Sequence, residues 1–589
     1  MYPRVKSIRK GGQVYQYVQM VEGSREGGRV RQRVVANLGR LDELKASGQL
    51  ERWAGAFARL DPPPLGTRRD VGALLMVSHY LRRLGVAALV DQVAPMRGQS
   101  LLTHGEVVAA LVANRLCCPA PLYDIASWAS SAAVAELVGV PAGLLNDDRL
   151  GRALDALAPV AEDLRARLLL RSLQRCELDA SRLHLDLTAV RFAGAYKGSG
   201  LVKKGWSAER TIGRQVKTLQ ACTKAGVALY FRPHQGASNE LPAFMEAVET
   251  LAASLAPGLV VVADSGLGYL ENLCALDSSK VGFVVPLRAD TGWAEHFCAD
   301  VPGGLGVLGR LGYCSQRERR LPDNERTVWK GLLRPLPVTD DHGEHHELHV
   351  AYIWSSEEQA SVKDARERAL QKAEEALGRV RNGLGGRYYK TKKQVDDRVA
   401  VVLSEKVAGL IDVCTGEAAD GKPTISWSRN HRALAKAGAL DGLYALATNL
   451  PVRQGRPMSA LDVLEIYKDQ WVIEQRHRDL KQTLLVRPVF LHNDARIESL
   501  VAVVGIALLI FGLIEAELRT ALGEGIALPG ILPEGRAAKP TARAALSAFD
   551  GLEATYTPNG LVLDRLSQVQ RIILALLDIP LPWPERGED

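Results

Sequence analysis

Residues 182–287 follow an order of strand-like and helix-like patterns that constrains how the chain can fold. Residues 182–192 alternate leucines with polar side chains that include Asp186, the pattern of a half-buried strand. Next come a hairpin that turns at Lys224-Ala-Gly226, a helix (240–255), a strand (259–263), a helix (269–276) and a strand (281–287). Helical crossovers give parallel strands whereas a hairpin gives antiparallel ones, so the sequence predicts an α/β fold with a mixed sheet.

This order of β, β-hairpin, α, β, α, β is that of the ribonuclease-H-like fold. The pattern breaks between 301 and 440, where short β-like runs (347–353, 400–403), a long charged helix (357–381) and turns predict a β-rich insertion domain. Residues 442–448 then predict a strand that returns to the core. The predicted domains are a basic β-hairpin segment (1–60), a helical domain (61–178), a first core segment (179–300), the insertion (301–440), a second core segment (441–515) and a helical tail (516–589).

The excess of basic over acidic residues in the chain is confined to its N-terminal end. The whole chain has a net charge of +7, and residues 1–40 alone carry nine basic and two acidic residues. Arg29, Arg31 and Arg33 lie in the second of two β-like runs, 13–21 and 29–36, of a predicted hairpin. Such clustering predicts an arm that contacts a polyanion, and the alternative is a solvated basic hairpin.

Cysteine spacing and hydropathy argue against several classes of protein. The eight cysteines show no CxxC or CxxH spacing, which indicates neither a disulfide framework nor a structural zinc site and favours a reducing cytoplasm. No apolar block follows the charged residues 4–10, so no signal peptide is expected. The apolar run 499–514 is shorter than the ~20 residues that span a bilayer. It therefore predicts a helix buried on all sides and no membrane partner.

Residues 467–481 place a carboxylate among phosphate-binding groups on one face of a predicted helix. At 100° per residue, the face comprises Tyr467, Gln470, Glu474, Arg478 and Lys481. The apolar residues of the segment lie largely away from this face (Ile466, Val472, Ile473 and Leu480). The helix is therefore expected to bury one side and to present an acid, an amide, a phenol and two cations on the other.

Two further carboxylates occupy positions suited to metal binding. Asp186 stands on the polar face of the first strand, and Asp264 ends the apolar strand 259–263. A carboxylate there is costly to bury unless it is paired or metal-bound, although an Asp before Ser-Gly also caps turns. With Glu474 they form an oxygen ligand set for two Mg²⁺ ions ~3.5 to 4 Å apart, which can activate a nucleophile and stabilise the leaving oxygen of a phosphodiester.

Together these motifs resemble the DDE transposases of bacterial insertion sequences, in the YREK-bearing insertion-sequence-4 superfamily and its insertion-sequence-1634-like branch. The motifs are the basic hairpin ending at Asn37-Leu-Gly39, Asp186-Leu-Thr188, Asp264-Ser-Gly266 and the segment 467–481. The resemblance implies that Asp186, Asp264 and Glu474 bind two Mg²⁺ ions, with Mn²⁺ as a substitute. It also implies that Tyr467 and Lys481 contact phosphates of the transposon end, and that the helical domain binds DNA.

One position departs from the family pattern. Gln470 stands where the family has an arginine, and an amide supplies neither the charge nor the fork geometry of a guanidinium. Arg478, one turn beyond Glu474, is the candidate to compensate for this change, and a reduced activity stays an open alternative. Trp471 and His477 point away from the centre of the polar face, which favours a buried structural role for both over base stacking.

Two other motifs carry less weight. Gly304-Leu-Gly-Val-Leu-Gly309 matches GxGxxG, but it follows no strand of a βαβ unit and therefore does not indicate dinucleotide binding. Residues 340–349 are rich in Asp, Glu and His. They lie where a polar hairpin turn is expected, so a solvated turn is favoured over a metal site.

The sequence therefore predicts a transposase that binds the terminal inverted repeats of its insertion sequence, cleaves the DNA ends and joins the 3′-hydroxyl ends to target DNA. Its expected partners are transposon ends, target DNA and a second copy of the chain on paired ends. Its expected location is the cytoplasm of a bacterium, in association with the nucleoid. Two alternatives stay open, namely a metal-dependent nuclease without strand transfer and a catalytically silent DNA-binding protein derived from a transposase.

Overall fold

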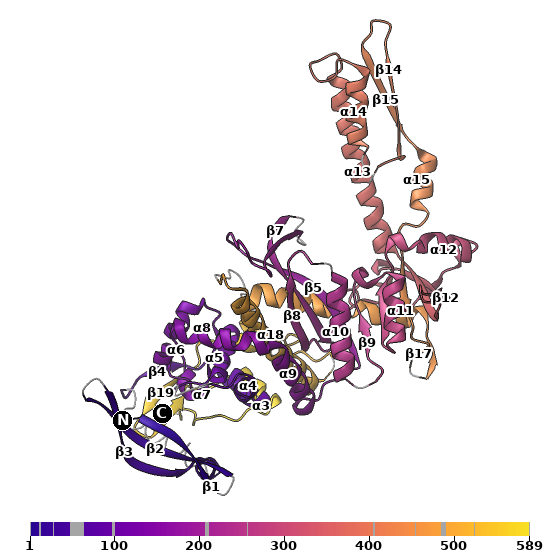
Figure 1. Cartoon of the computed structure of the whole chain (residues 1–589). Helices are drawn as coiled ribbons and strands as arrows, with labels where there is room; N and C mark the ends of the chain where they lie inside the picture. Colours follow the sequence, from indigo (N-terminus) through magenta and orange to yellow (C-terminus); the bar gives the residue numbers. More distant parts are fainter. Residues whose placement is uncertain are drawn as a thin grey trace. The chain divides into compact units, whose positions relative to one another are not determined.

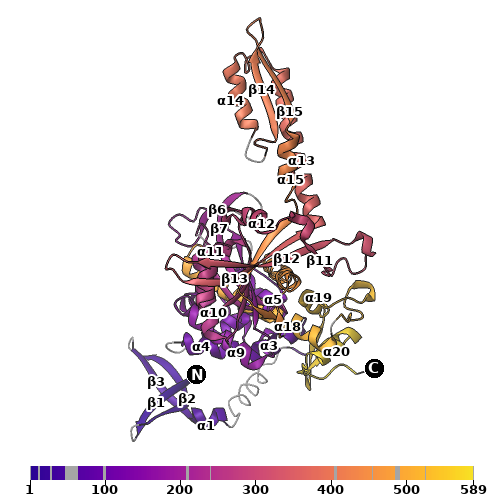
Figure 2. The ribbon, with the colours of Figure 1, turned by 90° about the vertical axis from the view of Figure 1, so that its right-hand side faces the viewer.

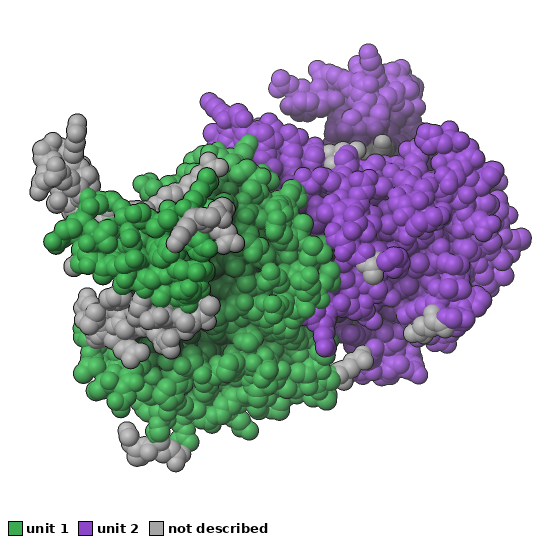
Figure 3. All heavy atoms as spheres, turned by 60° about the horizontal axis from the view of Figure 1, so that its bottom comes forward, with its two compact units in different colours: residues 1–175, 483–589 green, residues 176–482 purple. Residues whose placement is uncertain are grey.

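The computed structural model of the chain describes residues 2–10, 13–26, 29–46, 64–96, 101–206, 211–238, 240–255, 257–403, 407–453, 455–484, 491–523 and 525–587. The side chains of Arg29 and Arg31 lie outside this description. The chain divides into two compact units (Figure 3). Residues 1–175 and 483–589 form the first unit, and residues 176–482 form the second.

The first unit begins with a three-stranded antiparallel sheet, formed by β1 (Tyr2–Lys10), β2 (Gln13–Glu26) and β3 (Arg29–Arg40) and followed by α1 (Leu41–Ala46). β2 and β3 form a hairpin in the region where one was expected. β1 is an additional strand, which its charged sequence did not reveal. Arg33 is exposed on β3 and donates a 2.9 Å hydrogen bond to Glu22.

The rest of the first unit is mainly helical. Its helices are α3 (Leu74–Leu84), α4 (Val86–Val93), α5 (His104–Cys117), α6 (Ile125–Ser131), α7 (Val134–Leu137), α8 (Asp147–Leu157), α9 (Ala161–Arg175), α18 (Asp494–Leu522), α19 (Ala542–Ser547) and α20 (Gln568–Leu576). A small sheet joins β4 (Arg68–Asp70) to β19 (Glu553–Thr557) and β20 (Gly560–Leu563). The C-terminal segment thus carries two strands as well as helices.

α18 is the buried helix that the apolar run predicted. It is long and apolar enough to cross a membrane, but 89% of its most apolar 18-residue window is buried inside the protein. It packs against α5 and α8. Glu515 is a fully buried acid on this helix; it accepts a hydrogen bond from the Ala542 amide and pairs with Arg519 at 2.7 Å.

The second unit is built on one ten-stranded mixed sheet (Figure 1). Its strands are β5 (Arg182–Arg191), β6 (Lys203–Trp206), β7 (Ile212–Thr223), β8 (Ala228–Gln235), β9 (Val260–Val262), β10 (Gly282–Pro286), β11 (Gly309–Leu311), β12 (Trp329–Thr339), β13 (His345–Ser355) and β16 (Leu443–Thr448). The strand order is β11-β12-β13-β16-β10-β9-β5-β7-β6, and β8 also pairs with β7.

Strand directions in the centre of this sheet match the expectation of a mixed sheet. β5, β9 and β10 are parallel, whereas β7 runs antiparallel to both β5 and β8. The crossovers are α10 (Glu240–Ser254) and α11 (Leu270–Ser278), and α12 (Trp293–Asp300) follows β10. The five-strand order β8-β7-β5-β9-β10 is compatible with a ribonuclease-H-like domain.

Residues beyond β10 extend the same sheet and then leave it. The β-like run expected at 347–353 lies in β13, between β12 and β16 in the main sheet. The elements that follow β13 are α13 (Ser356–Asn382), α14 (Lys392–Val402), β14 (Ile411–Glu417), β15 (Pro423–Arg429) and α15 (His431–Gly438). α13 leaves the sheet and carries α14 and the β14–β15 hairpin (Figures 1 and 2).

This projecting region has its own apolar core, in which Leu377 and Val395 are fully buried. The β-like run expected at 400–403 is wrong, because these residues lie at the end of α14 and just beyond it. Val395, Val399 and Val402 follow the i, i+4, i+7 spacing of a helix and face the core of the projecting region. The helical period therefore outweighs the β propensity of the valines.

Replacing Glu515 by alanine should destabilise the first unit by about 3 kcal/mol, because it leaves Arg519 without its buried partner. Urea denaturation of the full chain measures this change. Glu498→Ala on the same helix is the matched control, since Glu498 is partly exposed and lies 3.9 Å from Arg165. It should change stability by less than about 1 kcal/mol. Equal effects of the two substitutions would contradict a stabilising role for the buried pair.

Candidate functional site

The parallel pairing of β5 with β9 aligns the first two predicted carboxylates. The register pairs His184 with Val262, the last residue of β9. Asp186 and Asp264 each lie two residues further along the chain, so both occur at the same level of neighbouring strands. The sheet therefore brings these two residues together, as the sequence predicted.

Backbone amides hold both of these carboxylates. The Leu187 amide donates to Oδ1 of Asp186 at 2.7 Å, and the Gly266 amide donates to Oδ1 of Asp264 at 2.9 Å. The second contact arises because Asp264 caps a short 3₁₀ turn directly after β9. Asp264 thus has the turn-capping role considered from the sequence, and this role also fixes the direction of its carboxylate.

The segment 467–481 is not one continuous α-helix. α16 (Ala460–Lys468) ends before Asp469, α17 (Trp471–Arg478) begins after Gln470, and a π-helical turn covers Asp479–Thr483. At the junction, i to i+3 bonds replace the α-helical ones, as when the Gln470 amide donates to the Tyr467 carbonyl at 3.0 Å. The expectation of a single polar face from 467 to 481 is therefore wrong.

Tyr467 nevertheless lies within electrostatic range of the three predicted carboxylates. Burial raises the pKa of its hydroxyl to about 12, and the negative charges of Asp264, Glu474 and Asp186 contribute in that order. All three carboxylates are thus close enough to Tyr467 to act on the same hydroxyl. This phenol is protonated at neutral pH and is available as a hydrogen-bond donor.

α17 lies against the strand that carries Asp186. The helix packs on β5 and β7, with Val472 and Ile473 buried and Glu474 exposed. Leu480 and Ile466 are also buried, which confirms the predicted apolar side of the segment. Glu474 therefore projects from a helix whose opposite side is anchored on the sheet.

His477 and Arg476 are residues near this site to which the sequence assigned no functional role. Nδ1 of His477 lies 3.4 Å from Oδ2 of Asp186, and burial lowers the pKa of the imidazole to about 3, so it is neutral. Arg476 is fully buried and donates to Asp479 at 2.9 Å. The i, i+3 spacing of Glu474 and His477 is the signal that could have placed His477 beside the carboxylates.

Gly226 permits the close approach of α17 to the β7–β8 turn. It has φ +86°, and a Cβ at this position would lie 3.0 Å from Nη2 of Arg476. The glycine is thus required both by the turn and by the buried arginine above it.

The remaining residues predicted for this region are differently placed. Gln470 is half-buried at the junction, Arg478 is exposed, and Lys481 lies in the π-helical turn. Trp471 is 38% exposed, so the expectation of a buried role for it is wrong. It opens α17, where its side chain reaches solvent instead of the sheet.

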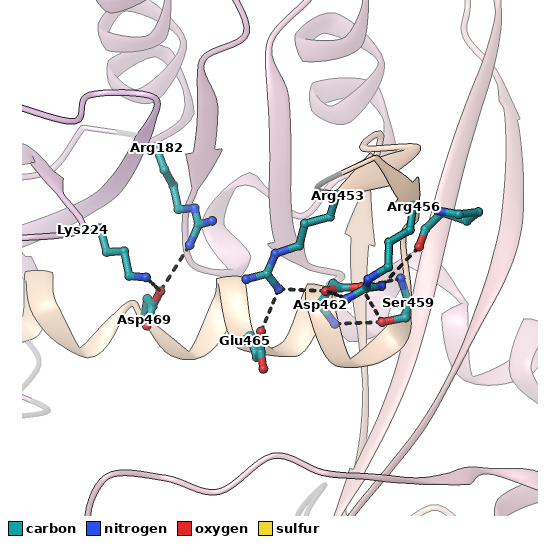
Figure 4. Close-up of polar contacts among 9 residues, drawn as sticks. Arg182, Lys224, Arg453, Arg456, Ser459, Asp462, Glu465 and Asp469 are labelled. Carbon is teal, nitrogen blue, oxygen red and sulfur yellow. Dashed lines mark hydrogen bonds and ion pairs between the residues drawn. The ribbon is translucent and has the colours of Figure 1, made fainter. Parts of the chain in front are cut away.

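A network of ion pairs fixes α16 and the junction (Figure 4). The hairpin of β17 (Val452–Arg453) and β18 (Arg456–Pro457) supplies two arginines that bind Asp462, at 2.9 Å for Arg453 and 2.7 Å for Arg456. Asp462 is 2% exposed and also accepts from the Ser459 amide in a capping box. These contacts fix the first turn of the helix that carries Tyr467.

The junction itself is tied to the strand that carries Asp186. Asp469 pairs with Arg182, the first residue of β5, at 3.2 Å and with Lys224 of the β7–β8 turn at 3.8 Å (Figure 4). Both ends of α16 are therefore held by charged contacts.

The spacing of the three carboxylates differs from that of a compact single-ion site. Within the described residues, the one group of three metal-ligating side chains whose ligand atoms all lie within 4.8 Å is Asp340, Glu344 and His346. The predicted set of Asp186, Asp264 and Glu474 is not such a group.

Comparison with protein families gives an independent result for the part of the chain that contains this site. The sequence profile of the transposase DDE domain matches residues 178–510, more than half of the chain. The chain belongs to the DDE transposases. The match covers all the predicted carboxylates of this transposase, and transposases act on DNA, so DNA is a partner of the chain.

Other matches cover the N-terminal region of the transposase. Residues 3–61 match the N-terminal domain of IS1634 family transposases, and residues 67–164 match a domain of unknown function (DUF4277). The first match supports assignment as an IS1634-family DDE transposase and covers the basic three-stranded sheet. A search of curated proteins finds no match to the chain.

Asp462→Asn should make the stability of the transposase less sensitive to acid. Burial alone would raise the pKa of Asp462, but hydrogen bonds from Arg456 and Ser459 outweigh it and lower the pKa from 3.8 to about 2. Because its pKa is lowered in the folded protein, ionised Asp462 stabilises the folded state by ~2 kcal/mol above pH 3.8. This stabilisation is lost as the pH falls towards 2. Urea denaturation at pH 6 and pH 2 measures this difference.

Glu465→Gln is the matched control for this experiment, because Glu465 binds the same Arg453 but is 44% exposed. It should cost less than about 1 kcal/mol. If the native protein and Asp462→Asn lose the same stability between pH 6 and pH 2, the network does not stabilise α16 in the way described.

Proposed function

We propose that this transposase binds the terminal inverted repeats of its insertion sequence, cleaves the DNA ends and transfers the 3′-hydroxyl ends into target DNA. The observation that carries the proposal is the alignment of Asp186 and Asp264 on neighbouring parallel strands, with Glu474 on the helix that packs against β5, inside the segment that matches the transposase DDE domain. Asp186, Asp264 and Glu474 act as the metal ligands of this reaction. The proposal further assigns the chain to the YREK-bearing insertion-sequence-4 superfamily.

The donor set fits hard divalent cations. Three carboxylates supply only oxygen ligands, and two of them are oriented by backbone amides. When two Mg²⁺ ions, or Mn²⁺ ions in their place, are bound there, they supply activation of the attacking oxygen and stabilisation of the leaving oxygen. DDE transposase domains generally use divalent metal ions.

Other side chains of the site bind and orient DNA in this proposal. Tyr467 keeps its proton, because its pKa is about 12, and donates a hydrogen bond to a phosphate of the transposon end. Lys481, Arg478 and Gln470 supply two charged contacts and one neutral contact to the same backbone. His477 is neutral and lies against Asp186, so it positions this carboxylate without adding charge.

The other regions of the chain contribute recognition and assembly. Arg29, Arg31 and Arg33 of the N-terminal sheet bind phosphates of the ends, and the helical segment 61–178 adds further DNA contacts. Residues 179–300 and 441–515 supply the ribonuclease-H-like core. Residues 301–440 are inserted between them in the sequence, where β11–β13 extend the main sheet and α13 leaves it. Two copies pair two DNA ends, in a bacterial cytoplasm at the nucleoid.

Conservative substitutions of the three carboxylates test the chemistry. Asp186→Asn, Asp264→Asn and Glu474→Gln should each reduce cleavage of end-containing DNA by at least ~10³-fold, because each removes a ligand charge from the metals. DNA binding should be nearly unchanged, since the affinity comes from basic groups. Gel assays of cleavage and mobility shift, in Mg²⁺, measure both properties.

Glu271→Gln is the control, because Glu271 is an exposed carboxylate of α11 in the same unit. Substantial cleavage by a folded single variant removes that residue from the proposed site. The reaction products also decide between the alternatives. Joined strands support transposition, cut strands alone indicate a nuclease, and a shifted band without cleavage indicates a silent DNA-binding protein.

Neutralising Arg29, Arg31 and Arg33 together should weaken binding to end DNA. The slope of log affinity against log salt concentration should also become shallower by about 0.9 for each phosphate that an arginine no longer neutralises. Fluorescence anisotropy over a range of salt concentrations measures the slope. Neutralising three exposed basic residues of α13, Lys363, Arg368 and Lys372, is the matched control. An unchanged slope in the arginine variant would indicate that these arginines are solvated and do not contact DNA phosphates.

A further inference from the structure

The turn between β12 and β13 carries a second group of metal-ligating side chains. Asp340, Glu344 and His346 each place one ligand atom within 4.8 Å of the other two. The sequence favoured a solvated turn here, and the acids do lie at the surface or partly exposed. His346 differs from them, because only 2% of it is exposed.

The two ring nitrogens of His346 have different environments. Nδ1 lies 2.9 Å from Oδ2 of Asp277, in α11, whereas Nε2 lies 3.8 Å from Oδ2 of Asp340. Among the described residues, the buried Nε2 has no hydrogen-bond partner. A metal ion bound at this nitrogen would satisfy the imidazole at the side that faces Asp340.

Asp277 is suited to orient the imidazole. Its Oδ1 accepts a 2.9 Å hydrogen bond from Asn449, and its Oδ2 faces Nδ1 of His346. With Nδ1 as the donor, the lone pair of the ring is on Nε2 and points toward Asp340. A carboxylate that binds the outer nitrogen of a histidine is the usual support of a metal-bound imidazole.

The turn holds Asp340 in a fixed orientation. Its Oδ1 accepts from the amides of His342 and Glu344, at 2.9 and 2.8 Å, so Oδ2 is the oxygen that faces His346. Ligand atoms around one Zn²⁺ ion, each roughly 2.0 to 2.2 Å from it, lie about 3 to 4 Å apart. The 3.8 Å separation of Asp340 Oδ2 and His346 Nε2 falls in this range.

We propose that Asp340, Glu344 and His346 bind a divalent transition-metal ion such as Zn²⁺, with Asp277 as the residue that positions His346. An imidazole with two carboxylates favours such an ion over Mg²⁺, which prefers oxygen ligands alone. Glu344 is exposed, so water can complete the coordination. The ion would fasten the β12–β13 turn to α11 through the contact of His346 with Asp277.

This metal site is distinct from the three catalytic carboxylates. The pairing of β10 with β16 and of β16 with β13 places His346 level with the amino end of β10. Asp264, in contrast, follows the carboxyl end of β9, which is parallel to β10. The two sites therefore lie at opposite ends of the parallel strands, and this proposal is independent of the proposed function.

The competing description is a protonated His346 held between two carboxylates without a metal. The hydrogen bond to Asp277 does raise the pKa of His346, which is compatible with that description. The 3.8 Å separation of Nε2 and Asp340 favours the metal, because an imidazolium would be expected to draw Asp340 into hydrogen-bond distance. Direct measurement of bound metal decides between the two.

The test uses the full-length chain with Asp186→Asn, Asp264→Asn and Glu474→Gln, so that the catalytic carboxylates do not contribute metal. After treatment with a chelator, incubation with Zn²⁺ and gel filtration, mass spectrometry should find about one Zn²⁺ per chain. Adding His346→Ala should abolish this retention. His342→Ala, an exposed histidine of the same turn, is the matched control and should retain the ion.

Asp340→Asn is a milder variant, because the amide oxygen can still accept the two backbone hydrogen bonds of the turn. It should weaken Zn²⁺ binding at least about 10-fold in calorimetric titration while circular dichroism stays unchanged. Zn²⁺ should also raise the melting temperature of the background protein but not of the His346→Ala variant. Failure of the folded background protein to retain Zn²⁺, or equal retention after Asp340→Asn, overturns the proposal. These experiments do not measure DNA cleavage, so the proposed zinc site and the proposed function can be contradicted independently of each other.

Discussion

Parallel pairing of β5, β9 and β10 is the constraint on which the rest of the second unit depends. Parallel strands need crossovers, and the apolar run that ends at Val262 can be buried on both faces only if helices cover the sheet. The same pairing sets the register that aligns Asp186 with Asp264. The requirement to bury valines thus also decides where two acidic side chains meet.

Charged contacts then bring the third carboxylate to this edge of the sheet. Asp462 anchors the start of α16, and Asp469 ties its end to Arg182 at the beginning of β5. α17 follows directly and packs its apolar side on β5 and β7. Glu474 is consequently held by a helix whose position depends on the strand that carries Asp186, although 288 positions separate the two residues in the sequence.

Local patterns predicted the strands of the centre, the buried helix α18 and the apolar side of the segment 466–480. They did not predict the backbone conformation where it depends on tertiary contacts. The helix breaks at Asp469, whose carboxylate pairs with Arg182 and Lys224, and periodicity does not reveal these long-range contacts. The charged β1 becomes a strand because β2 pairs with it. Hydrophobic periodicity indicates the conformation and the buried face of a single segment, so it does not reveal which segments pair.

The break at Asp469 also bears on the effect of having Gln470 in place of an arginine. The Gln470 amide donates to the Tyr467 carbonyl, and the Gln470 carbonyl accepts from the Ile473 amide at 3.1 Å. The backbone of Gln470, and not its side chain, makes these junction contacts. An amide in place of a guanidinium therefore removes one cation from the side that we propose to contact DNA, while the junction contacts that precede Glu474 are made by the backbone. The departure from the family pattern is expected to weaken contact with the DNA end while leaving the arrangement of the carboxylates intact.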